Sequence, residues 1–368
     1  MKLLELCCSP SKGGLELYFA NISNELQSHF DLVNVVAVDS AVCNLLEENR
    51  PVLTIHKKVH YFPLLSAIKL SKLIDEYGVD VLHLHWNKDL TVAVFAKLFS
   101  QRKPKIVLTR HMQFPSKKDG MLHRFLYKNI NHIIAVTNTM AHDLTRFIPE
   151  EVRPEISVNY LGIDTIEHAS AEVIAEKRAT YDPMQQLFLI GLFGRIDPYK
   201  GHDLFIDALI QAKVENKPFK GLIVGHPMDE SYLDALKQRV LDNQLEEYVV
   251  FTGFVDNPRA LMQACDTVIL ATVEETFGLV LIEAMSVGVP VIGSNRGGVP
   301  EIIDHQKTGL LFESEDSGAL YQALDSMYQN PEQAKLFASH ALETVSSKFS
   351  GKGHLDRLVS QLQAVHER

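Results

Sequence analysis

Two glutamates lie eight positions apart in the segment TVILATVEETFGLVLIEAM, residues 267–285. Five β-prone residues, a polar turn and a helical spacing of apolar residues from about Phe277 predict a strand, a turn and a helix. Such a junction presents backbone N–H groups and the positive end of a helix dipole, which favour an anion. Glu275 lies in the turn and Glu283 on the helix. We therefore expect the two carboxylates to flank an anion-binding point, where each accepts hydrogen bonds from hydroxyl groups.

A second segment supplies the cations that a phosphate beside two carboxylates requires. The residues GRIDPYKG, 194–201, follow a predicted strand and precede a predicted helix. Arg195 offers a planar fork for phosphate oxygens, and Lys200 offers a compact charge. A ligand with phosphate in the middle and hydroxyls at both ends fits this set, and a nucleotide sugar has that form. The alternative is an exposed basic loop beside two solvated acids.

Three further groups of residues have both a functional and a structural interpretation. Gly13 and Gly14 separate the first predicted strand from the first helix, where glycine lets backbone approach a phosphate, but the pair is also typical of a plain turn. Gly298 follows a predicted strand and either contacts the ligand through its N–H or completes a turn. His83 and His85 share one face at a strand end, where ordinary packing is favoured over a role with a second substrate.

The elements that must position these residues form two α/β series. Residues 1–165 read as one doubly wound domain, 180–345 as a second, and 346–368 as a helix that packs back on the first. A lapse in periodicity at 162–183 predicts the connection between the domains. We expect the two domains to face a cleft, with ligands at the carboxyl edges of their parallel strands. Strands are expected near residues 3–8, 33–38, 79–84, 105–109, 132–136, 156–159, 186–193, 221–224, 249–252, 267–271, 290–293 and 309–312.

Composition and charge exclude several classes of protein. No segment approaches 18 unbroken apolar residues, and residues 3–8 are too short for a signal-peptide core. The four cysteines show no metal-ligand spacing, and a reducing cytoplasm is the simplest location. The net charge is −10, but residues 1–160 carry 19 Lys/Arg against 16 Asp/Glu, while the remainder carries 17 against 30. Only the first part could favour an anionic surface.

A basic amphipathic stretch in that first part supplies the candidate contact with a membrane. It combines cations at Lys117, Lys118, Arg124 and Lys128 with Phe114 and other apolar residues up to position 126. The stretch could rest on anionic lipid at the inner face of a membrane. A solvated helix face is slightly favoured, because charge runs usually have that origin.

The motifs together resemble the signature of the family-4 retaining glycosyltransferases of GT-B fold. GRIDPYKG, then EETFGLVLIEAMSVGVPVIGS with its two glutamates, then GGVPEII carry the resemblance, and the N-terminal glycine pair and NYLGID also match. The resemblance implies two Rossmann-like domains and covers nearly the full length. It is specific in the second domain, which would bind the donor, and weak in the first, which would bind the acceptor.

Carried over by matching position, the family pattern implies a role for each candidate residue. Arg195 and Lys200 would hold the donor diphosphate, Glu275 hydroxyls of the transferred sugar, and Glu283 the ribose. The backbone of Phe277, Gly278 and Leu279 would assist, Gly14 would approach the phosphates, and the base would lie near Gly253 and Val255. His111, in LTRHMQ, matches a histidine that faces the donor sugar.

The expected activity is the metal-independent, retaining transfer of a hexose or N-acetylhexosamine, with UDP expected as carrier, to a glycan or lipid-linked acceptor. No cofactor and no nucleic-acid partner are expected, since the nucleotide sugar is a substrate. The chain has no Asp-x-Asp triplet, which argues against a divalent-metal diphosphate site. A nucleotide-sugar epimerase or hydrolase, and a non-catalytic binder of sugar nucleotides, remain as alternatives. The sequence leaves the sugar, the acceptor and the oligomeric state undetermined.

Overall fold

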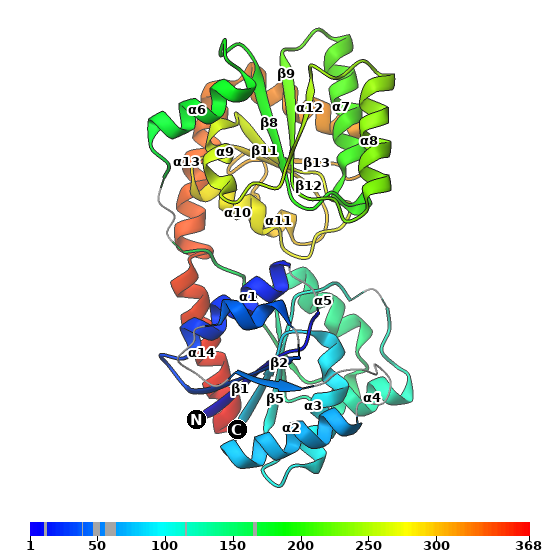
Figure 1. Cartoon of the computed structure of the whole chain (residues 1–368), viewed down its shortest axis with the longest axis vertical. Coiled ribbons are helices and arrows are strands. Elements are labelled where there is room, and N and C mark those ends of the chain that lie inside the picture. Colours follow the sequence, from blue (N-terminus) through cyan, green and yellow to red (C-terminus); the bar gives the residue numbers. More distant parts are fainter. Residues whose placement is uncertain (11–12, 39, 47–51, 56–63, 115, 165–167) are drawn as a thin grey trace. The chain divides into compact units, whose positions relative to one another are not determined.

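The computed structural model describes residues 1–10, 13–38, 40–46, 52–55, 64–114, 116–164 and 168–368. The chain divides into two compact units (Figure 1). The N-terminal unit comprises residues 1–160 and 352–368, and the C-terminal unit comprises residues 161–351.

The described part of the N-terminal unit contains one sheet of seven parallel strands in the order β3-β2-β1-β4-β5-β6-β7. In register, Glu5 of β1 pairs with His83 of β4, which pairs with Val107 of β5. The strands are β1 (Lys2–Cys7), β2 (Asp31–Ala37), β3 (Val52–Ile55), β4 (Val81–Leu84), β5 (Lys105–Arg110), β6 (His132–Ala135) and β7 (Glu155–Val158).

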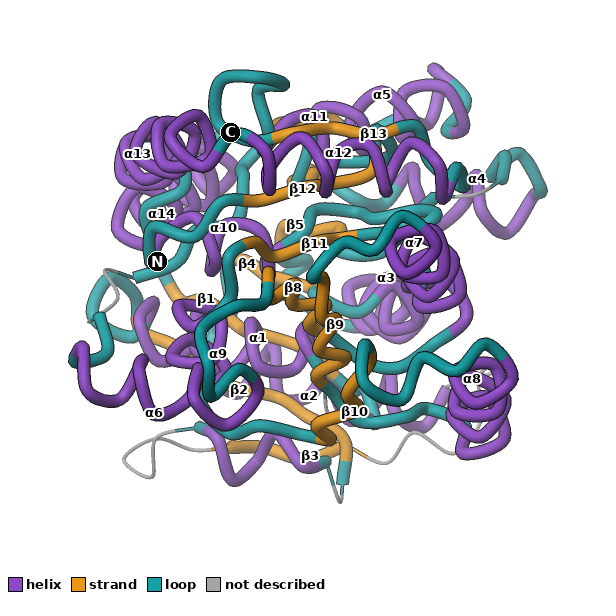
Figure 2. Tube along the Cα trace, turned by 90° about the horizontal axis from the view of Figure 1, so that it is seen from above, coloured by secondary structure: helices purple, strands orange, loops and turns teal. Residues whose placement is uncertain are grey.

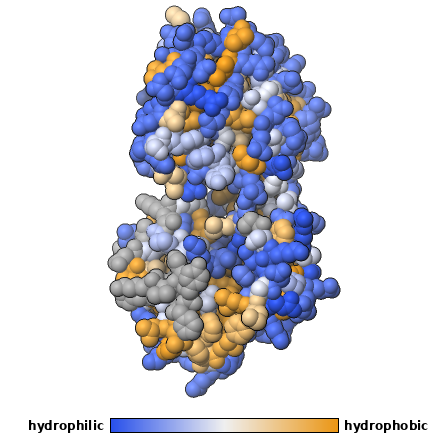
Figure 3. All heavy atoms as spheres, turned by 90° about the vertical axis from the view of Figure 1, so that its right-hand side faces the viewer, coloured by the Kyte–Doolittle hydropathy of each residue, from blue (hydrophilic) through white to orange (hydrophobic). Residues whose placement is uncertain are grey.

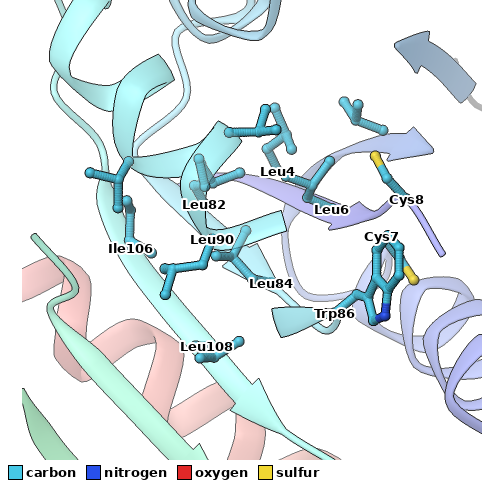
Figure 4. Close-up of a cluster of buried hydrophobic side chains, with 14 of the residues drawn as sticks. Leu4, Leu6, Cys7, Cys8, Leu82, Leu84, Trp86, Leu90, Ile106 and Leu108 are labelled. Carbon is cyan, nitrogen blue, oxygen red and sulfur yellow. The ribbon is translucent and has the colours of Figure 1, made fainter. Parts of the chain in front are cut away.

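Helices cover both faces of this sheet because its strands are apolar on both sides. Alternate residues of a strand point to opposite faces, so Leu3 packs with Leu358 and Leu362 on one face, while Leu4 packs in the cluster of the other face (Figure 4). The helices are α1 (Gly14–Leu26), η1 (Ala41–Leu45), α2 (Leu64–Tyr77), η2 (Asn87–Asp89), α3 (Leu90–Phe99), α4 (Met121–Lys128), α5 (Asn138–Phe147), η3 (Glu150–Val152) and α14 (Gly351–Glu367).

The C-terminal unit repeats this architecture with, among its described residues, six parallel strands in the order β10-β9-β8-β11-β12-β13. In Figure 2 these strands follow one another in that order, with α7 and α8 on one side and α9 and α6 on the other. The strands are β8 (Phe188–Phe193), β9 (Phe219–Val224), β10 (Val249–Gly253), β11 (Thr267–Leu270), β12 (Val291–Ser294) and β13 (Leu310–Phe312).

One core of this unit lies between the sheet and the helices α7, α8 and α12. Phe205 and Leu209 of α7 are fully buried there against Ile190 and Ile223 of the sheet. The helices are α6 (Ala171–Tyr181), η4 (Pro198–Lys200), α7 (His202–Val214), α8 (Glu230–Asp242), α9 (Pro258–Ala264), α10 (Leu279–Ser286), α11 (Val299–Ile302), α12 (Ser317–Gln329) and α13 (Pro331–Lys348).

The expected class, two Rossmann-like α/β domains, is confirmed. Several details differ from the sequence analysis. The expected connection at 162–183 contains α6, which has no apolar periodicity because none of its residues is buried. The helix expected at 346–368 is α14, which begins later, at Gly351, and α10 begins at Leu279, two residues later than expected.

Candidate functional site

The loop that carries the two candidate cations lies at the point where the strand order of the C-terminal unit reverses. From β8 the chain proceeds through β9 and β10 on one side, and then through β11, β12 and β13 on the other. Loops after β8 and β11 therefore leave neighbouring strands in opposite directions, which is where open α/β sheets bind ligands. The loop after β8 is GRIDPYKG, and the loop after β11 contains Glu275.

Backbone contacts hold the loop after β8 against its neighbours. The N–H of Gly194 donates to the carbonyl of Val224 at 2.9 Å, and the N–H of Val273 donates to the carbonyl of Tyr199 at 3.1 Å. Gly201 has φ of 75°, and a Cβ at this position would lie 2.0 Å from the carbonyl oxygen of Ala271. Only glycine therefore lets this loop approach the end of β11 so closely.

The two cations of this loop have different surroundings. Arg195 is exposed, and its Nη1 lies 3.7 Å from the sulfur of Met228. Lys200 is half-buried and forms an ion pair with Glu275, with 2.8 Å between Nζ and Oε2. The sequence analysis assigned Lys200 to a diphosphate and Glu275 to a sugar, and the structure joins them to each other. An anion at this position must therefore share Lys200 with Glu275 or displace the carboxylate.

The loop after β12 also reaches Glu275. The N–H of Gly298 donates to the carbonyl of Glu275 at 2.9 Å. Gly297 has φ of 59°, and a Cβ there would lie 1.9 Å from the same oxygen. The loop after β12 thus packs closely against the backbone carbonyl of Glu275, and Oε1 of Glu275 accepts a hydrogen bond from the N–H of Thr276 at 3.1 Å.

Helix α10 begins directly after this turn. Its N-cap residue Gly278 has φ of 111° and makes no side-chain cap hydrogen bond. The first N–H groups of an α-helix have no acceptor within the helix, so Leu279 at the start of α10 lies where an anion is favoured. The side chain of Phe277 is buried and contacts the ring of Phe349, which leaves its backbone as the group that a ligand could use.

Glu283 lies one turn into α10 and is half-buried. Burial raises the pKa of its carboxyl, and the nearby Arg259 partly opposes that shift. A carboxylate held out of water is stabilised by hydrogen-bond donors that replace the lost solvent.

The two residues expected near a base lie at the end of β10. Gly253 is the last residue of β10 and has φ of 72°. Its carbonyl accepts a hydrogen bond from the N–H of Gly225 at 3.0 Å, and the side chain of Val255 is half-buried. Their expected contacts with a base stay predictions.

In the N-terminal unit the strand order reverses between β1 and β4, and the candidates again follow these strands. Gly13 is the N-cap of α1 with extended backbone, φ of −154°, so no positive φ explains this glycine. A Cβ on Gly14 would meet nothing within 4 Å. The expected approach of a phosphate to Gly14 stays a prediction. Residues 11 and 12 of the same turn lie outside the described residues.

His111 follows β5 and lies in a cluster of aromatic rings. Its ring centroid is 4.6 Å from that of Tyr18 and 5.8 Å from that of His85. The rings of His111 and His85 are stacked, with an interplanar angle of 21°. Burial lowers the pKa of His111 well below the usual value, with further lowering by His85, His83, His354 and Arg110. His111 is therefore neutral near pH 7 and able to accept a hydrogen bond through a ring nitrogen.

A buried acid that the sequence analysis missed organises the neighbouring histidines. Glu5 is fully buried, and its two oxygens lie 2.7 Å from Nδ1 of His83 and 2.5 Å from Nε2 of His85. Nε2 of His83 lies 2.7 Å from Oγ1 of Thr109. The two histidines bring the pKa of Glu5 to about 2, against the effect of burial. The signal in the sequence was one charged residue inside the otherwise apolar strand LLELCC.

The described residues include one group with the arrangement of metal ligands. Ligand atoms of Glu5, His83 and His85 all lie within 4.8 Å of one another. Two imidazoles and a carboxylate suit zinc or iron. The atoms of the three side chains that face one another already form hydrogen bonds, whereas Nδ1 of His85 has no partner among the described residues.

The surface of α4 combines apolar and basic side chains. Met121 is 90% exposed and Leu122 52%, and Arg124 forms an exposed ion pair with Glu151. Lys118 lies over the ring of Phe114, 5.4 Å from its centroid. Figure 3 shows hydrophobic side chains gathered on the surface of this unit. Within the part of the chain that is described, no helix has both the length and the apolar character needed to cross a bilayer.

Comparisons with known families match both units. The profile described as "Glycosyltransferase Family 4" matches residues 12–167, and the profile described as "Glycosyl transferases group 1" matches residues 174–344. Each match falls on one Rossmann-like unit, so together they account for both halves of the fold.

Individual relatives extend over the full chain. The chain is 26% identical to the N-acetyl-alpha-D-glucosaminyl L-malate synthase of Bacillus anthracis, over 100% of the chain and 97% of the relative. It is 26% identical to the lipopolysaccharide core biosynthesis mannosyltransferase LpsB of Rhizobium meliloti, over 78% and 79%. The crystal structure of Anabaena HepE in complex with UDP and glucose superposes with a TM-score of 0.86 at 24% identity, over 99% of the chain and 100% of HepE.

Proposed function

Because this chain belongs to the group 1, family 4 glycosyltransferases, we propose that it is a retaining transferase that uses a UDP-linked sugar. The sugar is a hexose or N-acetylhexosamine, and the acceptor is a glycan or lipid-linked glycan of lipopolysaccharide, capsule or exopolysaccharide assembly. The observation that carries the proposal is the pairing of Lys200 with Glu275 at the strand-order reversal, 2.8 Å apart and beside the start of α10. Similarity to transferases that act on such glycans supports the acceptor class.

The proposed chemistry is neutralisation of the leaving diphosphate. As the glycosidic C–O bond breaks, Arg195, Lys200 and the N-terminus of α10 offset the charge that develops on the nucleotide. Glu275 orients hydroxyls of the transferred sugar, and Glu283 those of the ribose. His111, neutral and beside the end of β5, accepts a hydrogen bond from the sugar. The acceptor oxygen attacks the face from which the nucleotide departs, and a phosphate oxygen of the donor takes its proton.

Metal independence is part of this proposal. Arg195 and Lys200 occupy the role that a divalent ion has in transferases with an Asp-x-Asp triplet, which this sequence lacks. We expect full turnover after treatment with EDTA and no gain on addition of Mg²⁺ or Mn²⁺. Loss of turnover in EDTA that Mn²⁺ restores would contradict metal independence while leaving the transfer reaction intact.

The first experiment is a thermal-shift screen against UDP-, GDP- and ADP-sugars, because a donor that binds only the folded state raises its stability. The donor that stabilises the protein is then incubated with candidate acceptors, and the anomeric configuration of the product is read by NMR. Sugar turnover without any acceptor would instead indicate an epimerase or hydrolase, and binding without turnover would indicate a non-catalytic binder. An inverted anomer would contradict retention.

We also propose that α4 contacts anionic lipid at the cytoplasmic face of a membrane. Exposed apolar side chains beside Lys117 and Lys128 support a contact in which the apolar groups enter the interface and the cations meet lipid phosphates. The assay is flotation with phosphatidylcholine vesicles, with and without phosphatidylglycerol. Met121→Asp should abolish flotation with the anionic vesicles, whereas Val214→Asp, at an apolar position of α7 that is 75% exposed, should not. Equal flotation of both variants would contradict the contact.

A further inference from the structure

Helix α14 reaches the ring cluster of His111 through the side chain of His354, which contacts Tyr18 of α1. His354, in the first turn of α14, has its Nδ1 2.8 Å from the carbonyl oxygen of Tyr160 and its Nε2 2.9 Å from the hydroxyl of Tyr18. The ring of Tyr18 in turn contacts the ring of His111, with centroids 4.6 Å apart. A continuous series of contacts therefore joins the C-terminal helix to the histidine at the end of β5.

The direction of each hydrogen bond follows from the partners. A carbonyl oxygen only accepts, so Nδ1 of His354 carries the proton and donates to Tyr160. Burial lowers the pKa of His354 to about 4, so the ring is neutral near pH 7 and its Nε2 is an acceptor. The hydroxyl of Tyr18 must then donate to Nε2. Burial, Glu5 and Glu25 raise the pKa of Tyr18 well above its usual value, which keeps that hydroxyl protonated.

His354 is itself held firmly against the sheet. The side-chain amide of Asn159 donates to the carbonyl of His354 at 3.1 Å, and Nε of Arg357 donates to Oδ1 of Asn159 at 3.0 Å. The backbone N–H of Asn159 donates to the carbonyl of Ala135 at the end of β6. The hydroxyl of Tyr18 is thus anchored to the same sheet edge that carries His111.

His111 lacks such an anchor on one ring nitrogen. Among the described residues, no group hydrogen-bonds to Nε2 of His111. The orientation of its ring therefore depends on packing against Tyr18 and against His85, and Glu5 fixes His85 through Nε2. An imidazole with a nitrogen left without a protein partner and with its ring held by neighbours is suited to contact a substrate.

From this geometry we infer that Tyr18 is a positioning residue for His111, and that the hydrogen bond from Tyr18 to His354 fixes the ring of Tyr18. The inference rests on the proposed function in one respect, since the effect on turnover requires that His111 contacts the donor sugar. The effect on the orientation of His111 does not require it. The two are measured separately.

The orientation is measured by NMR of the labelled imidazole of His111 in the full-length protein. Tyr18→Phe keeps the ring and removes only the hydroxyl, and His354→Leu removes the acceptor. Both variants should shift the ring resonances of His111, because Tyr18 no longer holds the ring against His85. His354→Gln, whose amide oxygen can accept from Tyr18, should restore most of the wild-type signal. His366→Gln, at the far end of α14, is the matched control and should change nothing.

Turnover is measured as UDP release from UDP-glucose or UDP-N-acetylglucosamine in the presence of the acceptor found in the transfer assay. A displacement of a catalytic contact by 1 Å costs about 100-fold, so Tyr18→Leu should lower kcat by about that factor, Tyr18→Phe by less, and neither should change KM. His354→Gln should keep more turnover than His354→Leu. A general loss of folding would lower the melting temperature and the active fraction of all of these variants, without the rescue by glutamine.

The outcomes separate the two claims. Unchanged His111 resonances in Tyr18→Phe and His354→Leu would overturn the inference, whatever the kinetics show. Shifted resonances together with full turnover of His111→Ala would support the positioning of His111 and contradict its proposed role with the sugar. Shifted resonances together with lost turnover in His111→Ala and Tyr18→Leu would support both.

Discussion

The ion pair between Lys200 and Glu275 permits a test in which two variants of one contact change the affinity for UDP in opposite directions. The pair joins the loops after β8 and β11, and both side chains are largely shielded, at 27% and 18% exposed. In the free protein Lys200 is neutralised by Glu275. In the proposed complex it also contacts a diphosphate.

Lys200→Met should weaken UDP binding. A hydrogen bond to a charged group contributes about 1.5 to 3 kcal/mol, which corresponds to a loss of roughly 10- to 150-fold in affinity. The same substitution should change the free energy of unfolding by only about 0 to 1 kcal/mol, because a partly exposed ion pair contributes little. Binding and stability are therefore affected to different degrees.

Glu275→Gln should strengthen UDP binding. The amide keeps the shape of the side chain and removes the carboxylate that competes with the diphosphate for Lys200. Because the ion pair with Lys200 no longer has to be broken, the free energy of UDP binding should improve by about 0.5 to 1 kcal/mol, or roughly 2- to 5-fold in affinity. The affinity for the intact UDP-sugar should fall relative to that for UDP by about 10-fold or more, because a charged acceptor for the sugar hydroxyls is lost.

Isothermal titration of both variants with UDP and with the UDP-sugar measures all four affinities. The double variant Lys200→Met/Glu275→Gln shows whether the two residues act on the diphosphate independently. If Glu275→Gln lowered the affinity for UDP as strongly as Lys200→Met, the carboxylate would contact the nucleotide. The proposal that Lys200 binds the diphosphate and Glu275 binds the sugar would then be wrong. A loss of several kcal/mol of stability in either variant would show that the pair is structural.

Three other predictions concern single residues of the C-terminal unit. Glu283→Gln should lower the affinity for UDP by about 10-fold in titration calorimetry. It should not lower the melting temperature, since it removes a carboxyl whose pKa is raised by burial. An unchanged affinity would exclude a ribose contact. Gly201→Ala should cost about 2 to 5 kcal/mol in urea unfolding, because φ of 75° is strained for alanine and the Cβ would lie 2.0 Å from a carbonyl oxygen. Gly253→Ala, with φ of 72° and open space, should cost only about 1 to 2 kcal/mol, and equal costs would refute the steric argument. The pKa of His202 is lowered by burial to about 4, below its unfolded value, so its contribution to stability is complete above about pH 6.5 and is lost as the pH falls towards 4. Between neutral pH and pH 5, the free energy of unfolding of the wild type should therefore fall by about 2 kcal/mol more than that of His202→Gln.

The sequence was sufficient to predict the layers of the fold and most of the strands. Apolar runs such as residues 105–109 and 267–271 are buried on both faces, and this pattern is strong enough to predict a central strand without tertiary information. Helix α6 was missed because it has no buried apolar face and is held by ion pairs and hydrogen bonds of its polar side chains. Arg178 of α6 reaches Asp266 at 2.9 Å and Asp182 at 3.3 Å, a network that no local periodicity reveals.

The sequence predicted which residues form the candidate site, but it did not predict the contacts among them. Lys200 and Glu275 were named from the sequence, but the approach of the loops after β8 and β12 to Glu275 depends on which strands are neighbours. The pairing of Lys200 with Glu275 joins residues 75 positions apart. Tyr18 and His354 are 336 positions apart, and their contact has no signal in either local segment.

Recognition of an anion by the C-terminal unit must be local, because the overall charge of this part of the chain opposes it. Residues 161–368 carry 17 Lys/Arg and 30 Asp/Glu, so their summed field repels a nucleotide at long range. At physiological ionic strength charges more than about 8 Å apart are largely screened, and the groups beside the ligand decide binding. The cation of Lys200 and the first N–H groups of α10 are placed there by glycines that no side chain could replace at Gly201 and Gly297. The close packing of these loops would therefore allow an acidic unit to bind the nucleotide that we propose as its ligand.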